Sequence, residues 1–222
     1  MSRAADRALV TGAGRGLGRA LVAGLAATGC KVTATVRNLA DPVAGAVRVL
    51  ACDQGDPAAV EAVGQAMAGQ TLDTLIFNAA IRGDTGGLEG FSLTDFQRVM
   101  AVNVAGPVML FRALLPCLQD GAKVAFISSR AGSMAEGADP DGDHVYCASK
   151  AALNRIMVKL ADDHPDLIFL ALHPGWIRTD MGGPEAEVAI AESAAGILAR
   201  IAAATPDDSG SFQTWKGEPV GW

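Results

Sequence analysis

The sequence predicts an α/β fold: a doubly wound sheet of seven mostly parallel strands with helices on both faces. Short apolar runs rich in β-branched residues alternate along the chain with longer helical patterns. Nearly every residue within these runs is apolar, as expected for strands that are buried on both faces of a parallel sheet. Regular alternation of strands and helices is typical of a doubly wound fold.

The expected elements follow one another in a regular order. The predicted strands are Ala8–Thr11, Lys31–Arg37, Ala46–Leu50, Thr74–Asn78, Lys123–Ser128, Leu167–Leu172 and Ser211–Trp215. The predicted helices are Leu17–Thr28, Pro57–Ala68, Leu93–Leu118, Val145–Asp162 and Glu185–Ala203. A capping box, Ser92-Leu-Thr-Asp95, is expected to open the long third helix. The chain shows no linker, repeat or low-complexity segment, so we expect a single domain over residues 1–222.

Composition favours a globular protein and argues against two kinds of partner. Half of the residues are hydrophobic, which is enough to bury a sizeable core. The net charge of −6 and the isoelectric point near 5.0 argue against a nucleic acid or an anionic membrane as partner, because either would require a basic face. The N-terminal MSRAADRALV lacks the apolar stretch of a signal peptide. No apolar run is expected to approach the roughly 18 residues that span a bilayer, so a cytoplasmic location is predicted.

The cysteines indicate thiols rather than a metal centre. Cys30, Cys52, Cys117 and Cys147 are far apart and form no CxxC pair. This spacing suits buried thiols in a reducing cytosol and does not suit a zinc site. We therefore expect no metal.

A glycine-rich loop joins the first predicted strand to the first helix. It reads TGAGRGLG, which is TGxxxGxG with an extra glycine rather than GxGxxG. Glycines let the backbone turn sharply and bring its N–H groups to a phosphate, and the helix N-terminus adds the positive end of a dipole. A strand–loop–helix of this kind predicts a nucleotide site. The residues expected to hold the nucleotide are Gly12, Gly14, Arg15, Gly16, Leu17 and Gly18.

The second strand indicates which dinucleotide is bound. Proteins that bind NAD usually carry an acid about 20 residues after the glycine loop, where it bonds the ribose 2′-hydroxyl. Here the strand ends Thr35-Val36-Arg37-Asn38, and no acid occurs before Asp41. Two guanidiniums, on Arg15 and Arg37, suit a 2′-phosphate. NADP(H) is therefore predicted over NAD(H); the alternative is that both are solvated surface arginines.

Polar residues after the next strands extend this predicted site. Asp53, with Gln54, follows the third strand and could accept a hydrogen bond from the adenine amino group; the alternative for Asp53 is a turn or helix-cap residue. Asn78, Ala79 and Ala80 follow the fourth strand. Ligands of open α/β sheets bind at the carboxyl ends of the strands, where these residues are expected to lie.

The motifs TGAGRGLG, FNAA, VNVAGP, SSRAG, YCASK and HPGW occur in this order between about residues 8 and 181. Together they resemble the short-chain dehydrogenase/reductase family, whose fold is a Rossmann domain. SSRAGS, HPGWIRTDMGG and GSFQTWKGEPVGW resemble the branch that includes bacterial C-factor-like proteins and insect sniffer-type carbonyl reductases. The resemblance implies an NADPH-dependent oxidoreductase that transfers a hydride between the nicotinamide and a small carbonyl or alcohol substrate.

The resemblance also implies a catalytic tetrad of Asn103, Ser129, Tyr146 and Lys150. Tyr146, the only tyrosine in the chain, would be the general acid/base. Lys150 lies four residues on, on the same face of a helix, where an ammonium would lower the pKa of the phenol. In the family this lysine also bonds the nicotinamide ribose. Ser129 would hydrogen-bond the substrate oxygen, with Ser128 as the alternative.

Other positions are carried over from the same resemblance. Asn103 matches the family asparagine that helps to hold a proton-relay water; the alternative is an amide on the helix surface. The family places the Pro174-Gly175 turn beside the nicotinamide, where Ile177 and Thr179 could contact its carboxamide and a phosphate. Trp176 is expected either to shape the pocket or to lie in the core. His173, between apolar neighbours, is expected to be structural.

Three features depart from the family pattern. Ala80 stands where the family usually has glycine, and its methyl could crowd the cofactor. The spacing from Ser129 to Tyr146 is longer than usual. The intervening loop carries Asp139, Asp141, Asp143 and His144, and we interpret it as a solvated acidic loop rather than a substrate clamp. The segment after Met181 is short, which indicates an open substrate pocket.

Two further questions stay open at this level. A regulatory or cell-signalling protein of the C-factor type, which binds NADP(H) without needing turnover, is the alternative function, because fold does not fix function. Family members often dimerise through the long helix and the helix that carries the tyrosine. A homodimer is therefore possible.

Overall fold

The computed structural model describes residues 7–40, 43–136 and 143–222. Its strands are β1 (Arg7–Val10), β2 (Lys31–Val36), β3 (Ala46–Ala51), β4 (Leu72–Phe77), β5 (Leu118–Ile127), β6 (Ile168–His173) and β7 (Ser211–Thr214). They form one sheet in the order β3-β2-β1-β4-β5-β6-β7. Each of the six strand pairings is parallel. The predicted fold class is confirmed, and these strands are all parallel rather than only mostly so.

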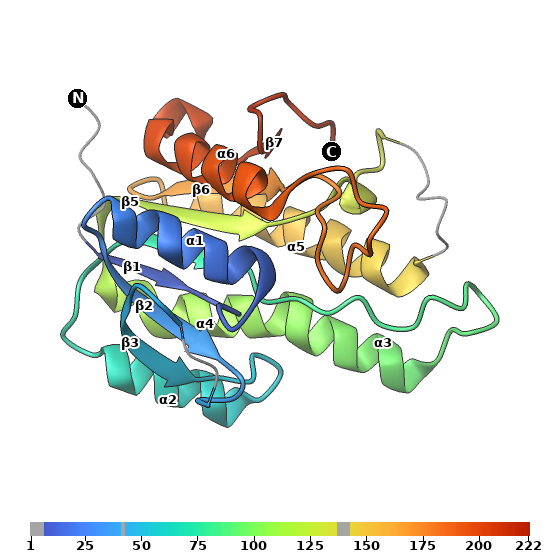
Figure 1. The fold of residues 1–222 in the computed structure, drawn as a ribbon, viewed down its shortest axis with the longest axis horizontal. Coiled ribbons are helices and arrows are strands. Elements are labelled where there is room, and N and C mark those ends of the chain that lie inside the picture. Colours follow the sequence, from blue (N-terminus) through green and yellow to red (C-terminus); the bar gives the residue numbers. More distant parts are fainter. Residues whose placement is uncertain (1–6, 41–42, 137–142) are drawn as a thin grey trace.

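Helices cover both faces of the sheet (Figure 1). They are α1 (Gly16–Ala27), α2 (Pro57–Met67), α3 (Leu93–Met100), α4 (Gly106–Leu114), α5 (His144–Asp163) and α6 (Ile190–Ala203). One core lies between the sheet and α1 and α6, where Leu21 and Ile197 are fully buried. The other lies beneath α2, α4 and α5 and includes Val63, Leu110 and Met157. Packing on both faces explains why the strands are apolar throughout, and it fixes the carboxyl edge of the sheet.

The predicted long helix is continuous but not uniform. The α-helix α3 passes into a π-helical turn at Ala101–Ala105, then into α4 and a 3₁₀ turn at Leu115–Cys117. Pro107 cannot donate to the carbonyl four residues earlier, which favours a break in the α-helical pattern. Gly106 lies so close to the loop after β3 that a Cβ would come 2.1 Å from the Gln54 carbonyl oxygen. Leu118, predicted as the end of this helix, instead begins β5.

The start of this helix differs in one detail from the expected capping box. The Ser92 side chain accepts a hydrogen bond from the Asp95 amide at 3.1 Å, as predicted. The Asp95 carboxylate accepts from the Asp84 amide at 2.8 Å and pairs with Arg98. It therefore ties the preceding loop to the helix.

The last helix begins at Ile190, five residues later than the predicted Glu185. The Val188 amide donates to the Trp176 carbonyl at 2.9 Å, and the Arg178 amide donates to the Val188 carbonyl at 3.0 Å. These bonds hold Val188 in an extended conformation beside Ile177. The loop between β6 and α6 is consequently longer than the sequence predicts.

The C-terminal segment folds back on β7 and reaches the loop that follows β5. Trp222 stacks on Phe212 at a centroid distance of 5.4 Å. Its carbonyl accepts from the amides of Met134 and Ala135 at 2.8 and 3.0 Å. The Ser133 hydroxyl donates to the Gly221 carbonyl at 2.5 Å. The base of the predicted acidic loop is thus fixed, while its Asp139 and Asp141 lie outside the described residues.

Hydropathy alone would allow the helical stretch Leu93–Cys117 to span a membrane. An 18-residue window within it has a mean hydropathy of 1.6, and 44% of that window is buried. The expectation that no apolar run is long enough is therefore wrong for this stretch. Phe111 and Leu114 pack in the core, as in many soluble proteins, so composition is weak support for a membrane span.

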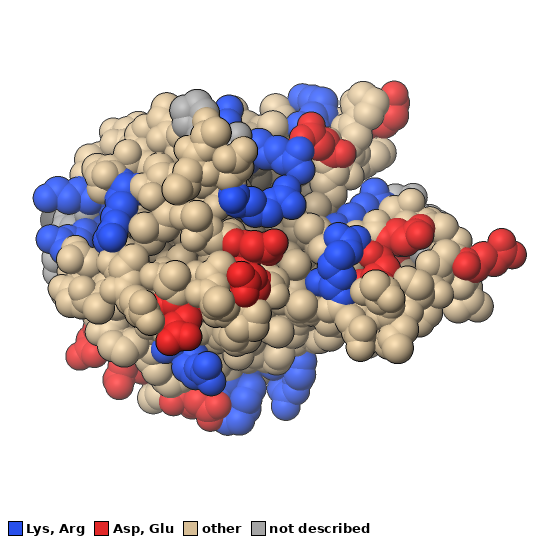
Figure 2. Space-filling model, turned by 90° about the horizontal axis from the view of Figure 1, so that it is seen from below, with Lys and Arg blue, Asp and Glu red and all other residues tan. Residues whose placement is uncertain are grey.

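On the face that Figure 2 shows, basic and acidic side chains of the described residues are interspersed. The absence of membrane and nucleic-acid partners stays a prediction.

Candidate active site

A cavity of about 1170 Å³ lies at the carboxyl edge of the sheet. The strand order reverses between β1 and β4, and the loops after β1, β4, β5 and β6 all reach this cavity. Its volume exceeds the range of about 300–1,000 Å³ typical of small-ligand pockets, so a dinucleotide and a substrate could share it. The predicted residues that line it are Gly12, Gly14, Arg15, Gly16, Leu17, Gly18, Arg37, Asp53, Gln54, Asn78, Ala79, Ala80, Ser129, Tyr146, Lys150, Pro174, Gly175, Ile177 and Thr179.

The glycine loop takes a shape that side chains would not allow. Gly12 and Gly16 have φ angles of +65° and +54°, in the region that favours glycine. A Cβ on Gly18 would lie 2.4 Å from the Gly12 carbonyl oxygen and 2.6 Å from Asn78 Nδ2. The start of α1 is therefore packed directly on the loop, and its N-terminus faces the cavity.

Asn78 and Thr11 brace this loop against β4. Asn78 Nδ2 donates to the carbonyls of Thr11 and Gly12 at 3.0 and 3.2 Å. Thr11 Oγ1 accepts from the amides of Asn78 and Ala79, both at 3.0 Å. Asn78 reaches the carboxyl edge as predicted, but its amide N–H groups are engaged in holding the glycine loop.

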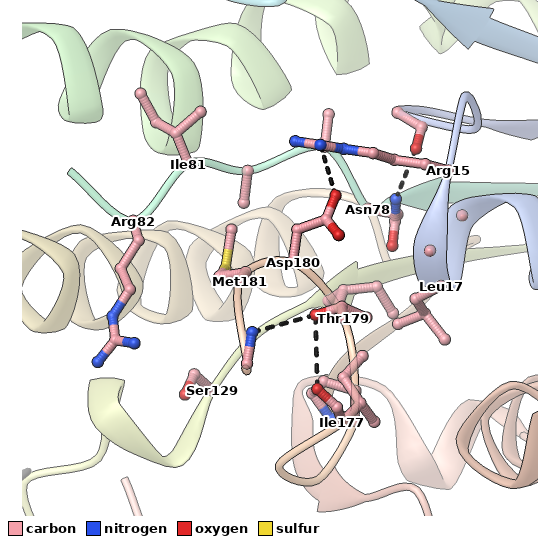
Figure 3. A pocket seen from close by; sticks show the side chains of 18 of the residues that line it. Arg15, Leu17, Asn78, Ile81, Arg82, Ser129, Ile177, Thr179, Asp180 and Met181 are labelled. Carbon is pink, nitrogen blue, oxygen red and sulfur yellow. Dashed lines mark hydrogen bonds and ion pairs between the residues drawn. The ribbon is translucent and has the colours of Figure 1, made fainter. Parts of the chain in front are cut away.

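The two arginines predicted to select the 2′-phosphate both line the cavity. Arg37 is exposed just after β2. Arg15 Nη1 lies 2.6 Å from Asp180 Oδ2, and this ion pair joins the glycine loop to the loop after β6 (Figure 3). The two side chains are 71% and 73% exposed. Such exposed pairs contribute only about 0–1 kcal/mol, so another anion can replace Asp180 at little cost.

Asp53 and Gln54 have structural partners in addition to their place at the cavity. Asp53 Oδ1 accepts from the Gly55 amide at 3.0 Å, which is the turn role given as its alternative. The helix cap of α2 is Asp56, which accepts from the Ala58 amide. Gln54 is buried and donates to the Val102 carbonyl at 3.0 Å.

Three side chains of the predicted tetrad converge on the cavity. Tyr146 and Lys150 lie one turn apart on α5, with Lys150 Nζ 5.6 Å from the centroid of the tyrosine ring. Lys150 Nζ also donates to the Ile127 carbonyl at 2.8 Å. The Ser129 side chain is hydrogen-bonded to Tyr146. Ser128, the alternative to Ser129, instead donates to Asn154 Oδ1 at 2.5 Å.

Burial dominates the ionisation of Tyr146 and Lys150. It raises the pKa of the Tyr146 phenol to about 12, although the hydrogen bond to Ser129 and the nearby Arg82 charge act to lower it. Burial also lowers the pKa of the Lys150 ammonium to about 8. The expected lowering of the tyrosine pKa is therefore wrong for this structure, because loss of water around the phenolate outweighs the hydrogen bond to Ser129 and the charge of Arg82.

Asn103 lies behind the cavity and is not among the described residues that line it. It sits in the π-helical turn and is 1% exposed, so the alternative of a surface amide is wrong. Its Oδ1 accepts from the Ile81 amide at 2.9 Å, and its Nδ2 donates to the Ile81 carbonyl at 2.8 Å. Nδ2 also donates to Ser149 Oγ at 3.0 Å. Asn103 thus joins the loop after β4 to the helix that carries Tyr146.

Replacing Asn103 with alanine is expected to lower the free energy of unfolding by about 1–3 kcal/mol, because it leaves the buried polar atoms of Ile81 without partners. Urea unfolding of the variant and the wild type measures this difference. Gln97→Ala is the matched control, since Gln97 is exposed one helix earlier and should change stability little. Equal unfolding free energies for Asn103→Ala and the wild type would contradict the bracing role.

The loop after β6 forms one wall of the cavity. The Pro174 carbonyl accepts from Ser193 Oγ at 2.6 Å, and Gly175 has a φ of +82°. Trp176 is 51% exposed at the cavity, so the alternative that it lies in the core is wrong. Its indole N–H donates to the Gly182 carbonyl at 2.7 Å. Thr179 Oγ1 accepts from the Gly182 amide, which closes the turn seen in Figure 3.

His173 ends β6 and also lines the cavity. Its Nδ1 accepts from the Arg130 amide at 3.4 Å. Burial, assisted by the Arg130 charge, lowers the pKa of this imidazole to about 4. A neutral ring that accepts a backbone hydrogen bond fits the structural role expected for it.

Sequence reasoning missed an ion pair beside the tyrosine. Arg82, in the loop after β4, contacts Asp143, the residue before α5, and both line the cavity. The Asp143 side chain is only 2% exposed, so its assignment to a solvated acidic loop is wrong. His144, its neighbour, is exposed. The partners are 61 positions apart in the sequence, so there is no local signal of this contact.

The described part of the chain shows how far the cysteines are buried and how its possible metal ligands are placed. Cys30, Cys52 and Cys117 are buried, and Cys147 is half-buried on α5. Burial raises the pKa of the Cys52 thiol to about 11. Across residues 7–40, 43–136 and 143–222, no three His, Cys, Asp or Glu side chains group as a metal site.

A parallel doubly wound sheet with a glycine loop at its switch point defines a Rossmann-type dinucleotide-binding protein. A family model described as short chain dehydrogenase matches residues 6–188. The chain therefore belongs to the short-chain dehydrogenase/reductase family of oxidoreductases, as the resemblance in its motifs predicted.

Individual relatives and solved structures are similar to the chain in the branch that includes C-factor-like proteins and carbonyl reductases. C-signal of Myxococcus xanthus is 38% identical over 155 residues, which cover 68% of this chain and 93% of the relative. An NADPH-bound carbonyl reductase from chicken fatty liver has a TM-score of 0.86 at 31% identity, covering 98% of this chain and 99% of its own. The carbonyl reductase Sniffer of D. melanogaster has a TM-score of 0.87 at 27% identity over the same shares. The predicted similarity to carbonyl reductases is thus confirmed.

Proposed function

We propose that this protein is an NADPH-dependent carbonyl reductase, which transfers a hydride between the nicotinamide and a carbonyl or alcohol substrate. The observation that carries the proposal is the meeting of Ser129, Tyr146 and Lys150 in the cavity that the glycine loop also lines. A proton donor and a nucleotide cradle in one cavity are what hydride transfer to a carbonyl requires.

The residues present fit a bound NADP(H). A Cβ on Gly12 or Gly18 would clash with protein atoms packed against the loop, so glycine lets the loop take this shape, and α1 begins beside it. Arg15 and Arg37 would hold the 2′-phosphate, with Asp180 displaced from Arg15. The turn at Pro174–Gly175, with Ile177 and Thr179, would border the nicotinamide. When bound, NADP(H) supplies or accepts the hydride.

The chain's own residues would manage the substrate oxygen and its proton. Ser129 would donate a hydrogen bond to the carbonyl oxygen and polarise it, and Tyr146 would donate the proton that completes the alcohol. A raised phenol pKa keeps this proton in place at neutral pH, which suits the reductive direction. Lys150 would bind the ribose. Asn103 would act as a positioning residue through Ile81 and Ser149.

The choice of NADPH over NADH is open to a direct test. Replacing Arg37 with serine is expected to weaken NADPH binding about tenfold while leaving NADH binding unchanged, because a charge-assisted hydrogen bond contributes about 1.5–3 kcal/mol. Fluorescence titration of both cofactors measures the two affinities. Lys31→Ser, at the other exposed end of β2, is the matched control and should change neither. Equal weakening for NADH and NADPH would contradict the phosphate role of Arg37.

The function itself is tested by following NADPH oxidation against a panel of aldehydes, ketones and quinones. Turnover on any of these carbonyls supports the reductase. NADPH binding without turnover would instead support a regulatory protein, the alternative suggested by the C-factor resemblance. Binding of neither nucleotide would overturn the proposal.

A further inference from the structure

An ion pair lines the cavity beside Tyr146. Arg82 Nε donates to Asp143 Oδ2, and the two side chains are 30% and 2% exposed. Figure 3 shows the Arg82 side chain extending toward the part of the cavity where Ser129 lies. The pair therefore belongs to the wall of the site, although no catalytic motif contains it.

The pair is joined to the first turn of the tyrosine helix. Asp143 immediately precedes α5, and its carbonyl accepts from the Cys147 amide at 2.9 Å. Arg82 follows Ile81, whose backbone is held by Asn103. A carboxylate buried this deeply requires a cation partner, since an unpaired buried charge is strongly destabilising. Arg82 supplies that cation and ties the loop after β4 to the start of α5.

Several charged and polar groups act on the Tyr146 phenol. Arg82 from the loop after β4 and Ser129 from the end of β5 favour its ionised form, whereas Asp143 and Cys147 from α5 and its approach oppose it. Lys150, on the next turn, donates to a backbone carbonyl. Burial brings the lysine pKa to about 8, so this ammonium loses its charge in mildly alkaline solution. An arginine keeps its charge at every accessible pH.

We propose that Arg82 and Asp143 are positioning residues that set the electrostatic potential at the Tyr146 hydroxyl. Arg82 supplies a permanent positive charge, and the negative charge of Asp143 opposes its effect. The inference rests on the proposed acid/base role of Tyr146. Arg82 stabilises the phenolate that remains after the proton has been donated to the substrate oxygen. Asp143 limits this effect, so that the hydroxyl still holds its proton before the transfer.

The two halves of the pair have opposite signs, and so do the expected effects of removing them. Arg82→Met leaves the Asp143 charge beside the phenol and raises the pKa of Tyr146. Asp143→Asn removes the carboxylate that opposes ionisation of the phenol and lowers this pKa. The double variant removes both charges and returns the pKa toward the wild-type value. Arg82→Lys keeps the charge and changes the pKa little.

The single tyrosine of the chain makes this measurable without a substrate. Because Tyr146 is the only tyrosine, the ultraviolet band of tyrosinate reports on this residue alone. Rapid mixing to about pH 11, read before the chain unfolds, gives the fraction ionised. Asp143→Asn is expected to show several times more tyrosinate than the wild type, and Arg82→Met several times less, as pKa shifts of about one unit would produce. Arg98→Met is the matched control, since Arg98 lines the same cavity and pairs with Asp95.

The outcomes separate this inference from the proposed function. The inference is supported if the tyrosinate fractions of Arg82→Met and Asp143→Asn shift in opposite directions and that of the double variant stays near the wild type. A titration that moves toward about 10, the value of free tyrosine, in each single variant would show that the pair only excludes water and would overturn the inference. Unchanged titrations alongside normal NADPH oxidation would overturn the inference alone. If Arg82→Met fails to fold, more tyrosinate in Asp143→Asn with no change in Arg82→Lys supports the inference, and an unchanged titration in Asp143→Asn overturns it.

Discussion

Tyr146→Phe is expected to reduce NADPH-dependent turnover of any carbonyl substrate by about a hundred- to ten-thousand-fold, the usual contribution of a positioned proton donor. Phenylalanine preserves the ring that packs beside Lys150 and removes only the hydroxyl that is hydrogen-bonded to Ser129. The loss should therefore appear in kcat, with the affinity for NADPH little changed. Steady-state kinetics and a cofactor titration on the same preparation measure both quantities.

Cys147→Ala gives the matched control for this variant. Cys147 follows Tyr146 on α5 and is similarly half-buried, so a general loosening of the helix would affect both variants alike. Activity within a few-fold of the wild type in Tyr146→Phe would contradict the acid role. A parallel loss in Cys147→Ala would indicate that the helix, rather than the hydroxyl, had been disturbed.

Local sequence signals were sufficient for the fold and, with the resemblance in the motifs, for many of the residues that line the cavity. The strands were recognisable because burial on both faces makes them apolar, and the glycine loop because its backbone angles exclude side chains. Tyr146 and Lys150 were placed together by helical spacing alone. Their joint place at the cavity with Ser129 required a topology that brings the ends of β1, β4, β5 and β6 to one edge.

Contacts between distant segments could not be predicted in this way. Arg15 meets Asp180 across 165 residues of sequence, and Arg82 meets Asp143 across 61. Asn103 was expected to touch water in the site, but the π-helical turn directs its amide to the backbone of Ile81. Each of these contacts depends on how loops from different strands approach one another, which no single segment encodes.

The direction of the Tyr146 pKa shift could not be predicted from local spacing either. A lysine at helical spacing correctly predicts a nearby cation, and a nearby cation lowers the pKa of a phenol. The degree of burial is a property of the whole fold, and here it acts in the opposite direction with the larger effect. Spacing therefore predicted the lysine neighbour of Tyr146, but it predicted neither the Arg82 charge nor the balance between this charge and burial.

Gly18→Ala is expected to weaken NADPH binding by about a hundredfold. Gly18 lies in the first turn of α1, where alanine is ordinarily favoured over glycine by roughly 1 kcal/mol. Here the added Cβ would lie 2.4 Å from the Gly12 carbonyl oxygen and 2.6 Å from Asn78 Nδ2. Neither atom can move without opening the brace between the glycine loop and β4, and overpacking of this kind costs about 1–3 kcal/mol. The loop would lose the shape that brings its N–H groups to a phosphate.

Gly24→Ala separates this effect from the general consequences of adding a methyl group to the same helix. A Cβ on Gly24 would meet only the Leu198 side chain, whose flexible end can move aside. Cofactor titration should therefore show near-normal NADPH affinity for Gly24→Ala and a large loss for Gly18→Ala, with both variants folded by circular dichroism. Normal NADPH affinity in Gly18→Ala would mean that the loop tolerates displacement, and that the phosphate is held mainly by the exposed arginines. The brace formed by Asn78 would then serve the stability of the sheet edge rather than the binding of the cofactor.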